Sequence, residues 1–378
     1  MKKLFLFVLL SYTVSAQSLS KRESKSTTEY HLYVGTYTLR TSEGIYVYRF
    51  NPQIGDFAPA GVAKGIKNPS FLAISPNQQF LYAAEGKSGE SVRSFSIDRQ
   101  SGQLTLLNVE SSGGLGPTHL MVDKTGKWLL VGNYTAGSLS CLPIQQDGRL
   151  GKAVQTIQHT GSSLHPERQR EPHVHSVNLA PNNRDLFVPD LGTDKIMTYL
   201  LNDQTGQLTP GSPPFTTVEP SSGPRHFDFH PNGRYAYVIQ EMGGLITGFR
   251  YKPGELTPFQ TVKTLPDDYT GLNTSADIHI SPDGRFLYGS NRGHESLVIY
   301  SIDSETGQLT YVGHQSVNGK TPRNFTIDPT GNYVLVANQD TDNITLFKRD
   351  HYTGKLTPTG KEISVSMPVC LKWLPAIP

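Results

Sequence analysis

The chain has 378 residues, 36% hydrophobic and 17% charged, with 36 glycines, 26 prolines, 18 tyrosines and 16 phenylalanines. The apolar content suffices for a large core and excludes a disordered chain, while the abundant Gly, Pro and aromatic residues are typical of short strands joined by tight turns. A formal net charge of +2 argues against a nucleic-acid partner held by broad electrostatics, so any anion recognition must be local.

The first residues have the three parts of a secretory signal peptide. Lys2 and Lys3 precede an apolar run over residues 4–10, and Val14-Ser15-Ala16 offers a small-residue cleavage site. The run is too short to span a bilayer. We expect an exported protein, periplasmic or secreted, with no membrane contact after cleavage. The alternative interpretation of this run is a buried N-terminal strand.

The rest of the sequence repeats one unit of roughly fifty residues. A Gly-x-Leu/Phe tripeptide marks each repeat and begins at Gly55, Gly102, Gly148, Gly206, Gly254, Gly307 and Gly354, at intervals of 47, 46, 58, 48, 53 and 47 residues. A second marker is a Pro-led strand, a Pro-Asn-Gly type turn and an aromatic strand, clearest over residues 69–85, 117–133, 224–241 and 322–338. Apolar residues alternate with a period of two, which indicates strands and not helices.

Self-similarity at this period, with about four strands per unit, predicts an all-β fold, a seven-bladed β-propeller. Residues 30–38 have no Pro-led strand before them, and residues 367–374 stop after one strand. A last blade closed by strands from both termini would remove an exposed sheet edge. The expected organisation is a signal peptide over residues 1–16, a polar leader over 17–28 and one propeller domain over 29–378.

Within a repeat, the start of the first strand lies beside the end of the second, because a tight turn joins two antiparallel strands. Arg225 and Glu241 should therefore be neighbours. Counting back from the turn gives an equivalent first position in six blades: Ser70, Thr118, His175, Arg225, Ala276 and Arg323. The next position holds Phe71, His119, Ser176, His226, Asp277 and Asn324. The strand ends hold Glu85, Asn133, Asp190, Glu241, Asn291 with Arg292, and Asn338.

These positions should converge at one mouth of the central channel, where they are rich in cationic and acidic side chains. An anion-binding basin is expected from Arg225, Arg292, Arg323, His175 and His226, since guanidinium forks match the oxygens of carboxylates and phosphates. Either His175 or Glu241 is the candidate general base. The arginines would also stabilise an oxyanion forming on a carbonyl. The set fits hydrolysis of a lactone with an acidic or polyhydroxylated substituent.

Each assignment has a structural alternative. Arg225 and Glu241 can form a salt bridge within one blade that has no catalytic part. Strand-end amides and acids are typical turn caps, which we expect of Asn133, Asp190 and Asn338. Together with Glu85, such oxygens would suit calcium, but the converging cations argue against a metal.

At these residues the chain resembles the lactonase family of seven-bladed β-propellers, which includes the propeller-type 6-phosphogluconolactonase and the 3-carboxy-cis,cis-muconate lactonizing enzyme. The similarity covers nearly the whole mature chain. Its motifs are YVGTYT at 33–38, HSVNLAPNNRDLFVPDLG from residue 175, GPRHFDFHPNGRYAYVIQE at 223–241, ADIHISPDGRFLYGSNR at 276–292 and TPRNFTIDPTGNYVLVANQ at 321–339.

The resemblance implies a carboxylic-ester hydrolase without cofactor or catalytic metal. The resemblance further implies site residues, because the histidine, two arginines and glutamate proposed as the active site of the family's cyclase branch fall on His175, Arg225, Glu241 and Arg292. We expect substrate binding by Arg323, His226 and Asp277.

The expected partner is a small-molecule lactone or acidic sugar derivative, and the protein should be a monomer or a weak homo-oligomer. Two other functions stay open: carboxymuconate cycloisomerisation and a non-catalytic periplasmic binding propeller. 6-Phosphogluconolactone arises in the cytosol, so the export signal favours another sugar lactone as substrate.

Overall fold

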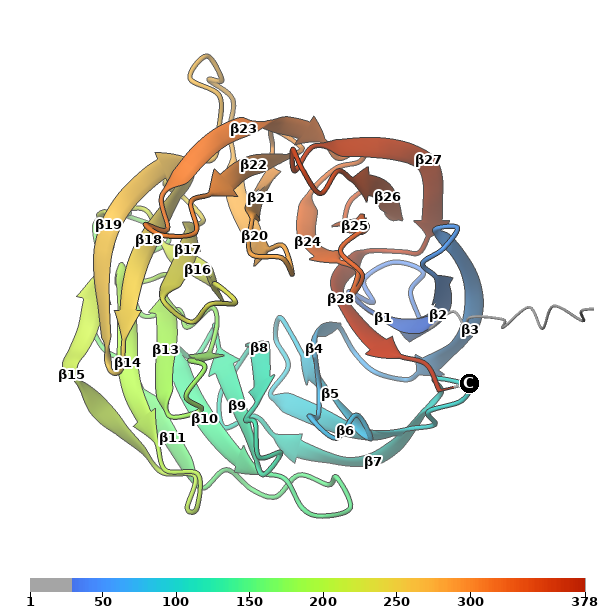
Figure 1. The fold of residues 1–378 in the computed structure, drawn as a ribbon. Coiled ribbons are helices and arrows are strands. Elements are labelled where there is room, and N and C mark those ends of the chain that lie inside the picture. The colour runs from blue at the N-terminus through green and yellow to red at the C-terminus, as the bar shows by residue number, and fades with distance from the viewer. Residues whose placement is uncertain (1–28, 378) are drawn as a thin grey trace, which may run out of the picture.

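The computed structural model describes residues 29–377, which form seven four-stranded antiparallel sheets in a ring around a central channel (Figure 1). The fold is the predicted seven-bladed β-propeller. The predicted signal peptide and polar leader lie outside the described residues. Over residues 29–377 the structure contains no helix able to cross a membrane.

Each sheet runs from a strand at the channel to a strand at the rim. The first sheet contains β28 (Pro368–Pro375), β1 (Tyr30–Thr36), β2 (Gly44–Asn51) and β3 (Asp56–Lys64). The second contains β4 (Pro69–Ile74), β5 (Phe80–Glu85), β6 (Ser91–Ile97) and β7 (Leu104–Ser111). The third contains β8 (Pro117–Val122), β9 (Trp128–Asn133), β10 (Ser138–Pro143) and β11 (Gln155–Gln158).

The remaining four sheets repeat this order. They are β12 (Asn178–Leu179), β13 (Asp185–Asp190), β14 (Lys195–Leu201) and β15 (Leu208–Thr217); then β16 (Pro224–Phe229), β17 (Tyr235–Gln240), β18 (Leu245–Lys252) and β19 (Glu255–Lys263). The last two are β20 (Thr274–Ile280), β21 (Phe286–Arg292), β22 (Ser296–Ile302) and β23 (Leu309–Ser316), and β24 (Pro322–Ile327), β25 (Tyr333–Asn338), β26 (Asn343–Arg349) and β27 (Leu356–Ser364).

Strands from both ends of the described chain close the ring, as the sequence predicts. β28 pairs antiparallel with β1, from Tyr30 opposite Pro375 to Thr36 opposite Pro368. In Figure 1 the two strands lie side by side at opposite ends of the colour scale. This pairing covers the edge that β1 would otherwise expose.

The core lies between the blades, because the second strand of a sheet has a neighbouring blade on each face. β5, β9, β13 and β17 are buried at every residue, whereas the rim strands β7 and β15 are largely exposed. Burial on both faces explains why the second strands are continuous apolar and aromatic runs.

The recurring Gly-x-Leu marker is a contact between blades. Four buried tyrosines donate a hydrogen bond to the glycine carbonyl of the following blade: Tyr33 to Gly102 (2.9 Å), Tyr82 to Gly148 (3.2 Å), Tyr237 to Gly307 (2.5 Å) and Tyr288 to Gly354 (2.8 Å). At Gly206 φ is +72°, and a Cβ there would lie 2.4 Å from the Trp128 ring. Only glycine fits this backbone and this approach.

A β-bulge interrupts the pairing near the start of most channel strands. In β16, Pro224 is opposite Gln240 and His226 is opposite Ile239, which leaves Arg225 without a partner in the ladder. Comparable register shifts occur in every other sheet except the one that begins with β12. The residues left without a ladder partner by these shifts are Ser70, Thr118, Ala276 with Asp277, Arg323 and Val369. A bulge redirects the side chain that it releases, so these residues are the ones available to the channel.

Candidate active site

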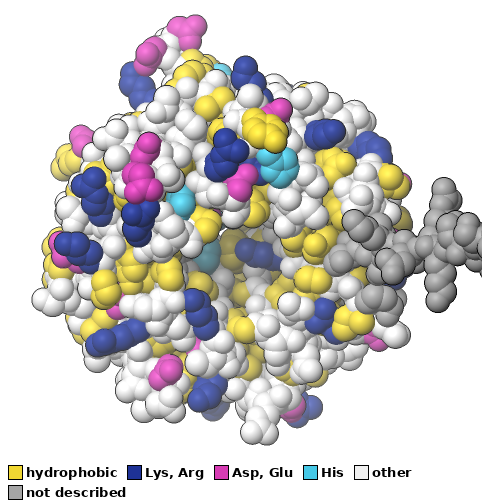
Figure 2. Space-filling view, viewed as in Figure 1, with side chains coloured by type: hydrophobic (Ala, Val, Ile, Leu, Met, Phe, Trp, Pro, Cys, Tyr) yellow, Lys and Arg dark blue, Asp and Glu magenta, His cyan; other side chains and the backbone are white. Residues whose placement is uncertain are grey.

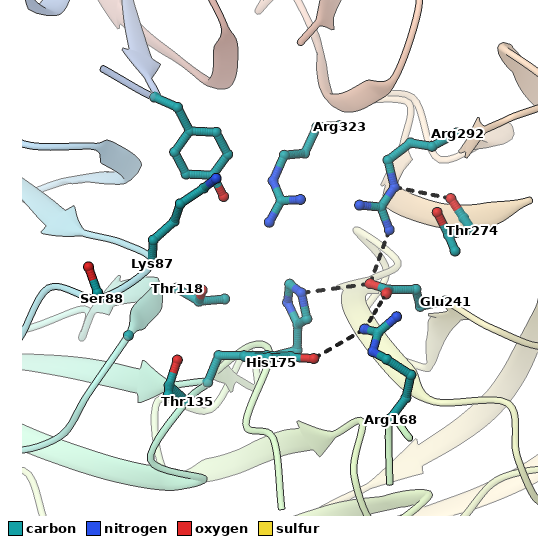
Figure 3. A pocket seen from close by; sticks show the side chains of 13 residues that line it. Lys87, Ser88, Thr118, Thr135, Arg168, His175, Glu241, Thr274, Arg292 and Arg323 are labelled. Atoms are coloured by element: carbon teal, nitrogen blue, oxygen red, sulfur yellow. Dashed lines mark hydrogen bonds and ion pairs between the residues drawn. The ribbon is translucent and has the colours of Figure 1, made fainter. Parts of the chain in front are cut away.

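A cavity of about 600 Å³ occupies one mouth of the channel (Figures 2 and 3). In Figure 2 the centre of the ring is hollowed, and Lys or Arg and His side chains are visible within it. The cavity is lined by Tyr37, Lys87, Ser88, Gly116, Thr118, Tyr134, Thr135, Arg168, His175, Glu241, Thr274, Arg292 and Arg323. Its volume suits a small-molecule ligand.

Glu241 directly follows β17, and its carboxylate is the centre of a buried ion cluster. Its Oε1 accepts a hydrogen bond from Arg168 Nη2 at 2.7 Å. Its Oε2 accepts one from Arg225 Nε at 2.9 Å and lies 3.1 Å from Arg292 Nη2. Burial alone would raise the pKa of this carboxyl, but the three guanidinium groups hold it far below the ordinary value. Glu241 is therefore ionised and its oxygens are occupied.

Backbone carbonyls fix two of these arginines. Arg225 Nη1 donates to the Ala276 carbonyl at 2.5 Å. Arg292 donates from Nε to the Thr274 carbonyl at 3.1 Å and from Nη2 to Ser275 at 3.2 Å. Burial and then the neighbouring Arg292 lower the pKa of Arg225 to about 9. With 1% of its surface exposed, Arg225 lies beneath the cavity and supports Glu241 from below.

His175 brings a neutral imidazole to the same carboxylate. Its Nε2 lies 3.9 Å from Glu241 Oε2, and its backbone N–H donates to Pro189. Burial, followed by the charge of Arg225, lowers the pKa of His175 well below the ordinary value. The ring is therefore uncharged near neutral pH and free to accept a proton.

Two further cations of the cavity lie against an aromatic ring and not against acids. Lys87 Nζ is 4.7 Å from the centroid of the Tyr37 ring, and Arg323 Cζ is 5.4 Å from it. Within residues 29–377 neither cation is in an ion pair, whereas the other three arginines of the site contact Glu241. Figure 3 shows Arg323 directed into the space opposite Glu241. These two groups are available to an anion.

Four of the sequence-predicted residues border the cavity: His175, Glu241, Arg292 and Arg323. The predicted substrate-binding residues His226 and Asp277 do not. They border a second cavity of about 200 Å³ deeper in the channel, where His226 Nδ1 lies 2.6 Å from Asp277 Oδ1. These two residues belong to the second position of the repeat, whose side chains point down the channel and away from the mouth.

The predicted alignment of strand ends is off by one residue at Glu241. Gln240 is opposite Pro224, as Glu85 is opposite Pro69 in the second sheet. Glu241 instead occupies the position after the strand end, which holds Tyr37 and Tyr134 in other blades. Glu85 lies nine residues after the turn residue Pro76, and Gln240 lies nine residues after Pro231, so a constant count from the turn gives Gln240 as the strand end.

The strand-end residues make structural hydrogen bonds, but of the three expected turn caps only Asp190 bonds the backbone of its own turn. The side-chain amides of Asn133 and Asn338 donate to the carbonyls of Ser112 and Val317, and Asp190 accepts from the Gly192 N–H. Glu85 pairs within its own blade, with Arg93 at 2.7 Å.

Sequence reasoning missed Tyr37, Lys87 and Arg168. Arg168 lies in the segment between β11 and β12, in the interval of 58 residues that exceeds every other interval between markers. That excess length was the available signal for an insertion over the channel mouth. Tyr37 would have been found by counting one residue past each strand end.

Residues 31–373 match the family model described as "Lactonase, 7-bladed beta-propeller". This match, together with curated relatives named 6-phosphogluconolactonase, defines a lactone-hydrolysing carboxylic-ester hydrolase. The chain belongs to the lactonase family of seven-bladed β-propellers.

Relatives with curated names and solved structures are similar over most of the chain. The 6-phosphogluconolactonase of Bacillus subtilis is 39% identical over 302 residues, which are 79% of this chain and 85% of that protein. A putative 6-phosphogluconolactonase from Bacteroides fragilis is 41% identical, with a TM-score of 0.88 over 93% of this chain and 99% of that one. The periplasmic gluconolactonase of Pseudomonas aeruginosa is 36% identical, with a TM-score of 0.88 over 93% and 100%.

Proposed function

We propose that the protein hydrolyses a sugar-type lactone in the cavity at the channel mouth. The observation that carries this proposal is a neutral, buried His175 facing the cavity beside an ionised Glu241. Lys87 and Arg323, two cations that pair with no acid within residues 29–377, border the same space.

His175 is the better candidate for the general base. The oxygens of Glu241 already accept from three guanidinium groups, which makes the carboxylate a poor proton acceptor. His175 has a free ring, and the negative charge of Glu241, 3.9 Å away, stabilises the imidazolium that forms.

The reaction follows from these positions. His175 removes a proton from water as the water oxygen adds to the lactone carbonyl, and Arg292 stabilises the oxyanion. Collapse of the adduct breaks the bond between the carbonyl carbon and the ring oxygen. The imidazolium returns its proton to that oxygen, which leaves a hydroxy acid.

Lys87 and Arg323 favour a lactone that carries an anionic group. Two cationic donors about one aromatic ring match the oxygens of a phosphate or a carboxylate. Relatives are named for phosphorylated and for plain gluconolactone. Both names denote a sugar lactone. Lys87 and Arg323 select the anionic substituent of that lactone.

The test is a turnover screen of the purified protein with 6-phosphogluconolactone, gluconolactone and a muconate-derived lactone. Acid release is followed at constant pH and corrected for spontaneous hydrolysis, with His175→Gln as the inactive control. We expect acceleration of a sugar lactone by the wild type only. Loss of the ultraviolet absorbance of carboxymuconate without sugar-lactone turnover would show a cycloisomerase, and binding without turnover would show a binding propeller.

We further propose that the protein is exported and matures at Gln17. Support comes from the basic, apolar and small-residue parts of residues 1–16 and from the periplasmic location in the name of the Pseudomonas relative. N-terminal sequencing of the periplasmic protein should begin at Gln17, and a cytosolic protein that retains Met1 would contradict the proposal.

A further inference from the structure

A third, much smaller cavity lies in the channel between the mouth cavity and the deeper one. Its volume is about 10 Å³, enough for one water molecule. It is bordered by released bulge residues, among them Ser70, Thr118 and Arg225, and by His175 and His226. It therefore touches the candidate base from the side opposite the substrate.

Two buried polar atoms that belong to residues bordering this cavity have no hydrogen-bond partner among residues 29–377. They are Ser70 Oγ and His175 Nδ1. Ser70 is 7% exposed and His175 is 4% exposed, so bulk water does not satisfy them. Buried polar groups are nearly always paired, with protein or with ordered water.

His226 supplies a third polar atom whose chemistry is set by Asp277. One oxygen of Asp277 lies 2.6 Å from His226 Nδ1, and the other accepts from the Phe325 N–H at 3.2 Å and lies 3.0 Å from His279 Nε2. Burial and the nearby Arg225 lower the pKa of His226 to about 4, so the ring is neutral. Its Nδ1 carries the proton toward Asp277, which leaves Nε2 as an acceptor.

We propose that one bound water in this small cavity joins His175 Nδ1, His226 Nε2 and Ser70 Oγ, and that Asp277 and His226 thereby fix the tautomer of His175. The water accepts from His175 Nδ1–H, donates to His226 Nε2 and shares its remaining hydrogen bond with Ser70. The rings of His175 and His226 lie 5.3 Å apart at 70°, so they are neighbours without a direct stacking contact. The lone pair of His175 then lies on Nε2, the nitrogen near Glu241.

This inference rests on the proposed function of His175 as the base. It gives His226, Asp277 and Ser70 positioning roles: they touch neither substrate nor the attacking water and act through His175. The deeper half of the channel thereby contributes to a reaction at the mouth, which explains a buried His–Asp pair outside the substrate cavity.

The test measures the tautomer and the water without substrate. Nitrogen-15 NMR of histidine-labelled protein should show His175 protonated at Nδ1. A high-resolution crystal structure should show an ordered water within hydrogen-bond distance of Ser70 Oγ and both histidines. A His175 protonated at Nε2, or no water in contact with both rings, overturns the proposal whichever lactone is the substrate.

Two substitutions at one position separate positioning from packing. His226→Gln places an amide near the former Nε2, whereas His226→Asn reaches only to the former Nδ1. We expect His226→Asn to mix the tautomers of His175 and lower kcat by about tenfold to a hundredfold with KM nearly unchanged. His226→Gln should restore the tautomer and most of kcat. Equal behaviour of the two variants contradicts the proposal.

A neighbouring histidine provides the packing control. The His119 ring packs against Phe71 at 4.1 Å with a tilt of 33°, and it lies 5.5 Å from the His226 ring, outside both the mouth cavity and the small cavity. His119→Phe should leave the His175 tautomer and kcat unchanged. A His119→Phe variant with the tautomer shift of His226→Asn would show that packing alone controls the ring.

Discussion

Both walls of the mouth cavity carry cationic side chains, but the walls differ in whether these cations are paired with an acid. On the paired wall (Glu241 and Arg292, with Arg225 beneath them), each of these two arginines contacts the carboxylate and a backbone carbonyl. On the open wall (Tyr37, Lys87 and Arg323), the two cations face an aromatic ring and have no acid partner among the described residues. The contacts of the paired wall therefore preorganise its side chains, whereas the two cations of the open wall are available to bind an anionic ligand.

The largest effect should come from Glu241→Gln, which leaves three guanidinium groups without a counter-charge. We expect a loss of about 3–5 kcal/mol in the free energy of unfolding. The kcat/KM for the sugar lactone should fall by a factor on the order of a hundred or more. Urea titration and initial rates measure the two quantities. Glu85→Gln, which removes a strand-end carboxylate with one cationic partner, is the matched control and should keep its activity.

The stability loss in Glu241→Gln should depend on pH. Because the folded-state pKa of Glu241 lies below its unfolded value, the carboxylate stabilises the fold fully above about pH 4.3, the usual value for Glu. The difference between wild type and variant should shrink as the pH falls below that value. A difference that grows on acidification would contradict the ionised state of Glu241.

A smaller loss of activity should follow Arg225→Lys, which keeps the positive charge but removes the forked guanidinium group. One ammonium cannot reproduce the geometry by which Arg225 contacts Glu241 and the Ala276 carbonyl at once. We expect kcat/KM to fall by about tenfold to a hundredfold. An unchanged rate on a confirmed substrate would remove Arg225 from the functional cluster.

On the open wall, Lys87→Gln and Arg323→Gln should affect binding and not stability. Neither cation would lose an ion pair with any residue of the described range 29–377, so the free energy of unfolding should change by less than about 0.5 kcal/mol. KM for an anionic lactone should rise by about tenfold, the worth of one charge-assisted hydrogen bond, while KM for a neutral lactone stays the same. An equal rise in KM for the anionic and the neutral lactone would mean that Lys87 and Arg323 do not recognise the anionic substituent.

The smallest effect should come from chelation. The family resemblance implies no metal, and within residues 29–377 no three His, Cys, Asp or Glu side chains are grouped as a metal site. Incubation with EDTA followed by rate measurement should leave kcat/KM unchanged. Loss of activity that zinc or calcium restores would contradict the mechanism on both walls.

Repetition made the fold predictable from the sequence. Seven markers and two incomplete ends specify seven blades and their closure, because each marker is a contact that every blade must repeat. The paired wall was predictable for the same reason, since Arg225 and Glu241 belong to one repeat. Their neighbourhood survived the one-residue error in register because the bulge releases Arg225 beside Pro224, and Glu241 directly follows the residue opposite Pro224.

The open wall and the insertion were harder to predict, because residues outside the ladder have no register to count from. Lys87 follows the end of β5 with a φ of +62°, a left-handed conformation that no repeat marker indicates. Arg168 belongs to a segment without an equivalent in any other blade. Its contact with Glu241, 73 residues away, depends on how that segment crosses the mouth.

The bulges have a consequence for how such a channel can change over evolution. A side chain released from the ladder can be replaced without removing a backbone hydrogen bond of that ladder. Here these sites hold residues as different as serine, threonine, arginine and valine on nearly the same backbone. The six bulged blades thus each offer at least one position at the common channel, and single exchanges there can admit new substrates while the backbone ladder stays intact.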